Sequence, residues 1–333
     1  MLSRTADNLF WMARHIERAE NIARVLDVAH RTSLLPLDVE GTEAYLWYAP
    51  LNITGCAAGY EEKHGLARAS AVTHYMALDP DNPSSIYSCL KMARENARTA
   101  RSAITSEMWE IINATWLELN RLSKQMDDEK FSNFFDWVKD RSHLFRGVTL
   151  GTIIKDIALS FIKLGTFLER ADNTARLLDV KYHILLTEKE NVGSSADYYQ
   201  WGSLLKSVSA FEAYRKIYRD VISPLRVAEL LILRDDMPRS LHACMNEVEA
   251  ALIEINGSAG KEARRSAGEL HAALHFGRIE DIFKDGLHEY LTHFLGQAYS
   301  LSQIIRDAYL ARQDRFETLP ISRAVQTQQQ ITS

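Results

Sequence analysis

The sequence is poor in residues that break helices, and it has no long apolar run. Its 333 residues include only 15 glycines and 7 prolines. Both residues destabilise helix interiors, so their scarcity favours long helices. No apolar run approaches the roughly 18 residues that a membrane-spanning helix needs, so we expect no membrane partner. Arg4, Asp7 and Arg14 interrupt any apolar segment near the start, which argues against a secretory signal.

The sequence also has few cysteines and no excess of basic residues. The three cysteines, Cys56, Cys89 and Cys244, are odd in number and lack Cys-x-x-Cys spacing, which argues against a disulfide framework or a zinc knuckle. We therefore expect reduced thiols and a cytoplasmic location. Lysine and arginine total 39 against 44 for aspartate and glutamate, a formal net charge of −5. Nucleic-acid-binding proteins usually carry a basic surplus or patch, so we expect no nucleic-acid partner.

The motifs of common catalytic and metal sites are absent as well. The glycines form neither GxGxxG nor GxxxxGK[ST], the loops that cradle phosphates. A di-iron bundle needs paired Glu-x-x-His motifs, whereas residues 61–64 (EEKH) give one instance without a convincing partner. His271 and His275 can share a helix face, but two ligands do not make a zinc site. We expect no metal and no cofactor. With no complete catalytic constellation, the sequence leaves open whether the chain is an enzyme.

What the sequence does have is helical periodicity along most of its length. No stretch alternates with period two, so the pattern predicts an all-α fold of about ten to twelve helices. Loops rich in Asp, Asn, Pro, Ser or Gly separate helices near residues 79–85, 191–195 and 256–258. The expected helices span residues 3–33, 43–60, 66–78, 84–103, 105–125, 131–146, 149–187, 196–220, 224–234, 238–256, 259–275 and 278–312.

An internal repeat is the strongest signal. Residues 17–28 (ERAENIARVLDV) and 169–180 (ERADNTARLLDV) are identical at nine of twelve positions. Further identical residues, which we call echoes, occur in the same order in both halves. They are Trp47 and Leu51 with Trp201 and Leu205; Pro83, Ser85 and Cys89 with Pro238, Ser240 and Cys244; and Asp136, Lys139, Asp140 and His143 with Asp281, Lys284, Asp285 and His288.

We interpret these echoes as a tandem duplication. A period near 150 residues is too long for a solenoid repeat. The pattern predicts two helical bundles, residues 1–150 and 151–312, related by a pseudo-two-fold axis, followed by a polar and flexible tail at 313–333.

The repeated segment gathers its charges on one helix face. A helical wheel puts Glu17, Glu20, Asn21 and Arg24 on a polar stripe, with Arg18 at its edge. The second copy places Glu169, Asp172, Asn173 and Arg176 on the same stripe, with Arg170 at the edge.

The stripe has three interpretations: a solvated face with i,i+4 ion pairs, a buried structural network, or a ligand or partner site. We expect the two stripes to face each other, with Glu17 of one pairing with Arg176 of the other.

These segments resemble the bacterial alpha-E domain family, an all-helical family named for its Glu-Arg motifs. The resemblance rests on the two Glu-Arg segments and on residues 93–98 (ARENAR) and 106–110 (SEMWE), and it covers about residues 1–312. The family's motif positions fall on Glu17, Arg18, Glu169 and Arg170, and in the middle motif on Arg94, Glu95, Asn96 and Arg98. The resemblance implies an association with a circularly permuted ATP-grasp ligase, often with a transglutaminase-like peptidase nearby.

Two functional hypotheses follow. The first is an accessory or partner subunit of an ATP-grasp-type peptide or amide ligase system, which docks or regulates the ligase or holds its acceptor through the charged Glu/Arg/Asn face. The alternative is an enzyme or binding protein for a small zwitterionic ligand in a cleft between the two motif helices. Arg24 and Arg176 would then grip a carboxylate, while Glu17 and Glu169 accept hydrogen bonds from an amine.

Overall fold

The computed structural model describes residues 1–33, 42–187 and 195–310, and within these ranges it contains fifteen α-helices and no strand. The all-α prediction is therefore confirmed, although the helices are more numerous than expected. The predicted tail at 313–333 and most of the predicted loop at 191–195 lie outside the described residues. No described helix combines the length with the apolar character that a membrane span requires.

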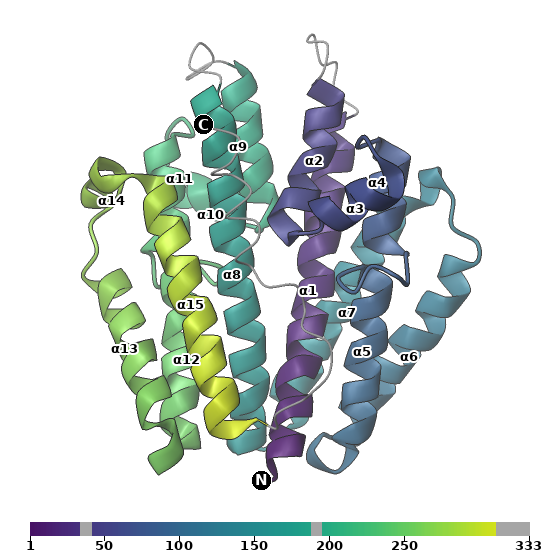
Figure 1. Cartoon of the computed structure of the whole chain (residues 1–333), viewed down its shortest axis with the longest axis vertical. Coiled ribbons are helices and arrows are strands. Elements are labelled where there is room, and N and C mark those ends of the chain that lie inside the picture. The colour runs from purple at the N-terminus through teal and green to yellow at the C-terminus, as the bar shows by residue number, and fades with distance from the viewer. Residues whose placement is uncertain (34–41, 188–194, 311–333) are drawn as a thin grey trace.

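Two 31-residue helices, α1 (Ser3–Ser33) and α8 (Ile157–Thr187), lie side by side at the centre of the molecule (Figure 1). Around α1 are packed α2 (Thr42–Thr54), α3 (Ala57–His64), α4 (Ala69–Ala77), α5 (Ile86–Thr99), α6 (Ser106–Ser123) and α7 (Phe131–Thr152). Around α8 are packed α9 (Ser195–Ser207), α10 (Phe211–Tyr218), α11 (Pro224–Ile232), α12 (Leu241–Ile255), α13 (Lys261–His275), α14 (Ile279–Asp285) and α15 (Leu287–Tyr309).

Three expected helices are each divided in two by a residue with positive φ. Gly55 (φ 68°) separates α2 from α3, Ser209 (φ 53°) lies between α9 and α10, and Gly286 (φ 105°) separates α14 from α15. A right-handed helix cannot continue through such a residue.

The helix predicted from residue 149 also begins later than expected. Helix α7 continues to Thr152, and α8 begins at Ile157 after Asp156, whose carboxylate accepts the backbone N–H of Ala158 at 2.8 Å. This is the hydrogen bond of a helix N-cap, which fixes the start of α8.

Helix α1 contributes to both hydrophobic cores of the molecule. Leu9 and Met12 belong to the core that includes α8 and the helices after it. Ile22 and Leu26, nearer the end of α1, belong to the core formed with α2–α7. One helix thus ties the two groups of helices together, and its polar groups are carried into the interior with it.

Helix α8 approaches α1 closely at Gly165. A Cβ atom at this position would lie 2.2 Å from the backbone oxygen of Phe10 and 3.2 Å from the Cβ of Ala13. Any side chain here would push the two helices apart. The absence of a side chain at this contact therefore allows the charged segments one turn further along to meet.

Candidate functional site

The two Glu-Arg dipeptides meet at the contact between α1 and α8, and they pair reciprocally. Arg170 donates through Nε and Nη2 to the two carboxylate oxygens of Glu17, each at 2.9 Å. In the opposite direction, Arg18 donates through Nε and Nη2 to Glu169 at 2.6 and 3.1 Å. Both pairs are bidentate, the strongest geometry for an arginine and a carboxylate.

This pairing corrects the partner that the sequence predicted. Glu17 pairs with Arg170, and Arg176 binds Asp172 on its own helix at 2.8 Å. The wheel placed Arg18 and Arg170 at the edge of the stripe, and it is this edge that faces the neighbouring long helix. A wheel of one helix cannot show which edge its neighbour will cover.

Glu17 binds two further arginines, which come from other parts of the chain. Arg239, in the loop before α12, donates through Nη1 to Glu17 and to the side-chain oxygen of Asn21, at 3.0 Å in each case. Arg146 of α7 donates to Glu17 at 3.1 Å. The Glu17 side chain is only 1% exposed, so protein atoms enclose it.

Glu20 is the second buried carboxylate of this network, and its side chain is fully enclosed. It accepts hydrogen bonds from Arg24 at 2.8 Å and from the hydroxyl of Ser142 at 2.6 Å. Arg146 and Arg239 also donate to Glu20, so both arginines bridge Glu17 and Glu20. We call these residues the Glu-Arg network: Glu17, Arg18, Glu20, Asn21, Arg24, Ser142, Arg146, Glu169, Arg170 and Arg239.

The electrostatics agree with ionised carboxylates in this network. Burial raises the pKa of Glu17, but the charges of Arg170 and Arg239 outweigh this effect and hold the pKa below its ordinary value. Glu169 is likewise penalised by burial, yet Arg18 and Arg14 lower its pKa to about 2. These carboxylates therefore remain charged, because the arginines offset the loss of hydration.

The two copies of the motif are not equally buried. Asp172 and Arg176 form a half-buried i,i+4 pair, whereas the corresponding Glu20 and Arg24 are enclosed. Arg24 also donates to the hydroxyl of Ser209 at 2.7 Å. Asn173, unlike the buried Asn21, is half-buried.

The middle motif forms a separate group on α5 and α6. Arg94 donates to Asn113 and to Glu95, at 2.8 Å in both cases, and Arg98 donates to Glu95 at 2.9 Å. Among the polar residues of this motif, only Asn96 is buried. The structure therefore brings the two Glu-Arg segments together, whereas the charged side chains of the middle motif pair among themselves and with α6.

The cysteines offer no activated nucleophile. All three are free thiols. Burial raises the pKa of Cys89 and of Cys244 to about 12, and it raises the pKa of Cys56 as well. A catalytic cysteine needs the opposite shift, because the thiolate is the reactive form.

Sequence reasoning missed Arg239, Arg146 and Ser142. The repeat pointed to the segment around Arg239, since Pro83 and Ser85 echo Pro238 and Ser240. Arg239 itself falls opposite Ser84 in that register, so the comparison of the two halves hid it. Arg146 and Ser142 lie on α7, and in the register of the echoes on that helix they fall opposite Leu291 and Leu287, so the repeat did not mark them.

The geometry bears on both functional hypotheses. The charges that would grip a zwitterion are engaged already: Arg24 with Glu20, Arg176 with Asp172, and Glu17 with three arginines. A binding site would need such groups open to a ligand. The arrangement therefore favours the buried structural network among the three interpretations of the stripe.

Comparison with known proteins identifies a family for residues 1–310. They match Alpha-E, described as a predicted alpha-helical domain with a conserved ER motif. The Glu-Arg dipeptide occurs twice in this chain, at residues 17–18 and 169–170, and these are the residues that pair across α1 and α8.

The chain is also similar to longer mycobacterial proteins. An uncharacterized protein of Mycobacterium bovis and one of Mycobacterium tuberculosis are each 22% identical to it over 93% of the chain. The match spans only 37% of the length of each relative. No solved structure matches the chain.

Proposed function

The chain belongs to the Alpha-E family, and from this premise we propose that it is a non-catalytic partner subunit of an ATP-grasp-type peptide or amide ligase system. In this role it docks or regulates the ligase, or holds the acceptor of the ligase reaction. A circularly permuted ATP-grasp ligase is the proposed partner, with a transglutaminase-like peptidase as a second member of the system.

One observation carries the proposal: the Glu-Arg groups that define the family bind one another in the interior. Glu17 and Glu169 are each held by arginines of the neighbouring long helix. Acid–base or nucleophilic chemistry requires such groups to face a substrate. The motif thus stabilises the fold. A stable helical protein without a reaction centre of its own is suited to positioning another protein.

The lengths of the relatives support a role beside another protein. In the mycobacterial proteins, a segment similar to this chain shares a polypeptide with other sequence that makes up most of the length. Covalent linkage holds domains at a high effective concentration. Linkage of this kind is common for domains that work together, and it agrees with a partner function for the Alpha-E unit.

We also propose that the two halves arose by duplication and are related by a pseudo-two-fold axis. The helices support this view, since α1 to α5 have the same order and similar lengths as α8 to α12. Individual residues support it as well. Trp47 and Trp201 are both fully buried, and Ser85 and Ser240 both cap the helix that follows them.

Reconstitution tests the partner role. The full chain and the circularly permuted ATP-grasp ligase of the same organism are purified separately, mixed, and analysed by size-exclusion chromatography and by ligase assay. We expect a stable complex and a change in the rate of ATP-dependent amide formation. Two separate peaks together with an unchanged ligase rate would overturn the proposal.

A pair of variants sharpens this test. Glu118→Gln breaks only an exposed ion pair with Arg121 on α6, and it should bind the ligase like the wild type. The Glu17→Gln variant should bind the ligase less only because a smaller fraction of it is folded. Circular dichroism measures this folded fraction. A folded Glu17→Gln protein that binds the ligase but fails to change its rate would instead give the motif a direct role in the reaction.

A further inference from the structure

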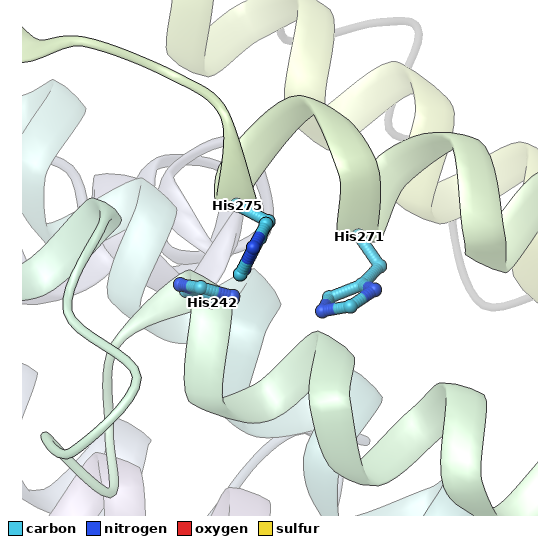
Figure 2. Close-up of side chains that lie close together, drawn as sticks. All are labelled: His242, His271 and His275. Atoms are coloured by element: carbon cyan, nitrogen blue, oxygen red, sulfur yellow. The ribbon is translucent and has the colours of Figure 1, made fainter.

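Three histidines lie together on α12 and α13, away from the Glu-Arg network. His271 and His275 are four residues apart near the end of α13, and His242 is the second residue of α12. One ligand nitrogen from each ring lies within 4.8 Å of the other two. Figure 2 shows the three rings directed toward one another from the two helices. The sequence revealed only the pair on α13, and the fold adds the third member.

Two of the rings are already oriented by hydrogen bonds that their Nδ1–H groups donate. His242 Nδ1 lies 2.8 Å from the backbone oxygen of Leu233, and His271 Nδ1 lies 2.7 Å from the carboxylate of Glu249. A carbonyl oxygen can only accept, so the Nδ1 atom of His242 carries the hydrogen. A carboxylate fixes the same tautomer for His271. In each ring this leaves Nε2 with the lone pair that can bind a metal ion.

We propose that His242, His271 and His275 form a binding site for a divalent late transition metal ion, with Zn²⁺ as the representative ligand. Three imidazoles suit Zn²⁺, Cu²⁺ or Ni²⁺, whereas Mg²⁺ and Ca²⁺ require oxygen ligands. Two histidines at i and i+4 on one helix face are an established zinc-binding arrangement. The fourth position of a tetrahedral ion would be filled by water or by an added ligand.

The site must contract when the ion binds. Zinc–nitrogen bonds of about 2.0–2.1 Å place tetrahedral ligand atoms roughly 3.3–3.5 Å apart, which is closer than the upper limit of 4.8 Å in this structure. His275 is exposed and His271 is only partly buried. Both rings can therefore turn toward His242, which is buried and serves as the fixed member of the site.

The location gives the ion a structural consequence. His242 lies three residues after Arg239, the arginine that binds both Glu17 and Glu20. An ion shared by α12 and α13 would join the start of one helix to the end of the other. It would thus restrain the segment that delivers Arg239 to the Glu-Arg network. Binding to the folded state alone raises thermal stability by mass action.

Competition titration tests the site. The full chain is freed of metal with a chelator and titrated with Zn²⁺ against a chromophoric chelator, and Co²⁺ absorption reports the ligand geometry. We expect one ion per chain, a rise in melting temperature, and a Co²⁺ spectrum of low coordination number. His271→Asn and His275→Asn should each weaken binding by more than about 100-fold, and Glu249→Gln by about 10–100-fold, as for other residues that orient a metal ligand.

The matched control is His293→Asn, which removes an exposed histidine on α15 and should leave Zn²⁺ affinity unchanged. Circular dichroism shows whether each variant folds. Because His275 is exposed, its replacement is expected to disturb the fold least. Ring packing alone, without a metal site, predicts no stoichiometric binding by the wild type, or the same affinity in the His275→Asn and His293→Asn variants. Either result overturns the proposal, and neither depends on the ligase partnership.

Discussion

Arg170 on α8 holds the carboxylate of Glu17 on α1 with two hydrogen bonds of 2.9 Å, one from Nε and one from Nη2. Arg18, which follows Glu17, and Glu169, which precedes Arg170, form a second pair in the opposite direction. A Glu-Arg dipeptide thus provides an anion and a cation to the same neighbouring helix. One motif alone would leave Glu17 without its bidentate partner and Arg18 without Glu169, so the two copies stabilise each other.

Glu17→Gln should destabilise the protein strongly. The amide keeps the shape of the side chain but leaves the buried Arg170 without the carboxylate that binds it, and it removes one of the two carboxylates that bind the buried Arg239. We expect the free energy of unfolding to fall by about 3–5 kcal/mol, the cost of breaking a buried ion pair. Urea denaturation measures this change. The control, Glu118→Gln on the exposed face of α6, should show no measurable shift of the midpoint, and equal midpoints for the two variants would refute burial of the network.

Gly165→Ala should destabilise the contact between α1 and α8. The added Cβ would lie 2.2 Å from the backbone oxygen of Phe10, and backbone cannot move aside as a side chain can. Overpacking of this kind costs about 1–3 kcal/mol or more. Gly296→Ala on α15 is the matched control, because a Cβ there meets no atom within 4 Å. It should stabilise the helix by about 0.4–1 kcal/mol. Thermal melts that shift in the same direction for both would contradict this view of the contact.

Much of the fold could be predicted from the sequence because helix signals are local. The bounds of α1 agree with the predicted helix at 3–33, and α6 lies within the predicted helix at 105–125. The interruption at Ser209 could not be predicted, since serine rarely adopts a positive φ and the sequence has no glycine there to signal a helix end. The cap at Asp156 was present in the sequence but was hidden by continuous apolar periodicity on both sides.

The site was predicted in part for a similar reason. The repeat identified Glu17 and Glu169, because two copies of one motif are visible without a structure. It could not identify Arg239, because the corresponding residue of the first half is Ser84. His242 was missed because its two partners lie on another helix. Contacts between residues far apart in the chain are set by packing, which a local pattern does not contain.

Glu169 should make stability depend on pH in the acid range. Its pKa falls from 4.5 to about 2 on folding because Arg18 and Arg14 overcome the effect of burial. A lowered carboxyl pKa stabilises the fold above pH 4.5, and this contribution is lost as pH falls toward 2. The shift corresponds to about 3 kcal/mol. Urea denaturation should show wild type and Glu169→Gln far apart at pH 7 and converging toward pH 2. A constant difference across this range would rule out the assignment.

His15 should add a second pH dependence at higher pH. Burial, aided by the charge of Arg18, lowers its pKa from 6.5 to about 3, so the folded protein keeps the ring neutral while the unfolded chain protonates it. Stability therefore falls as pH drops below 6.5, by about 2 kcal/mol between pH 6.5 and pH 5. His15→Leu should flatten this part of the profile and leave the decline below pH 4.5. Parallel profiles for wild type and variant above pH 4.5 would count against a neutral His15.

A double-mutant cycle between Glu17 and Arg170 tests the central claim most directly. The claim is that the two Glu-Arg dipeptides form one buried network between α1 and α8. Denaturation of Glu17→Gln, Arg170→Met and the double variant gives the coupling energy, and a second cycle of Glu17 with the exposed Arg121 should show no coupling. We predict that the double variant loses less than the sum of the single variants, with a coupling of about 1–3 kcal/mol. Losses that add to within about 0.5 kcal/mol would show that the two residues act independently and would contradict the network.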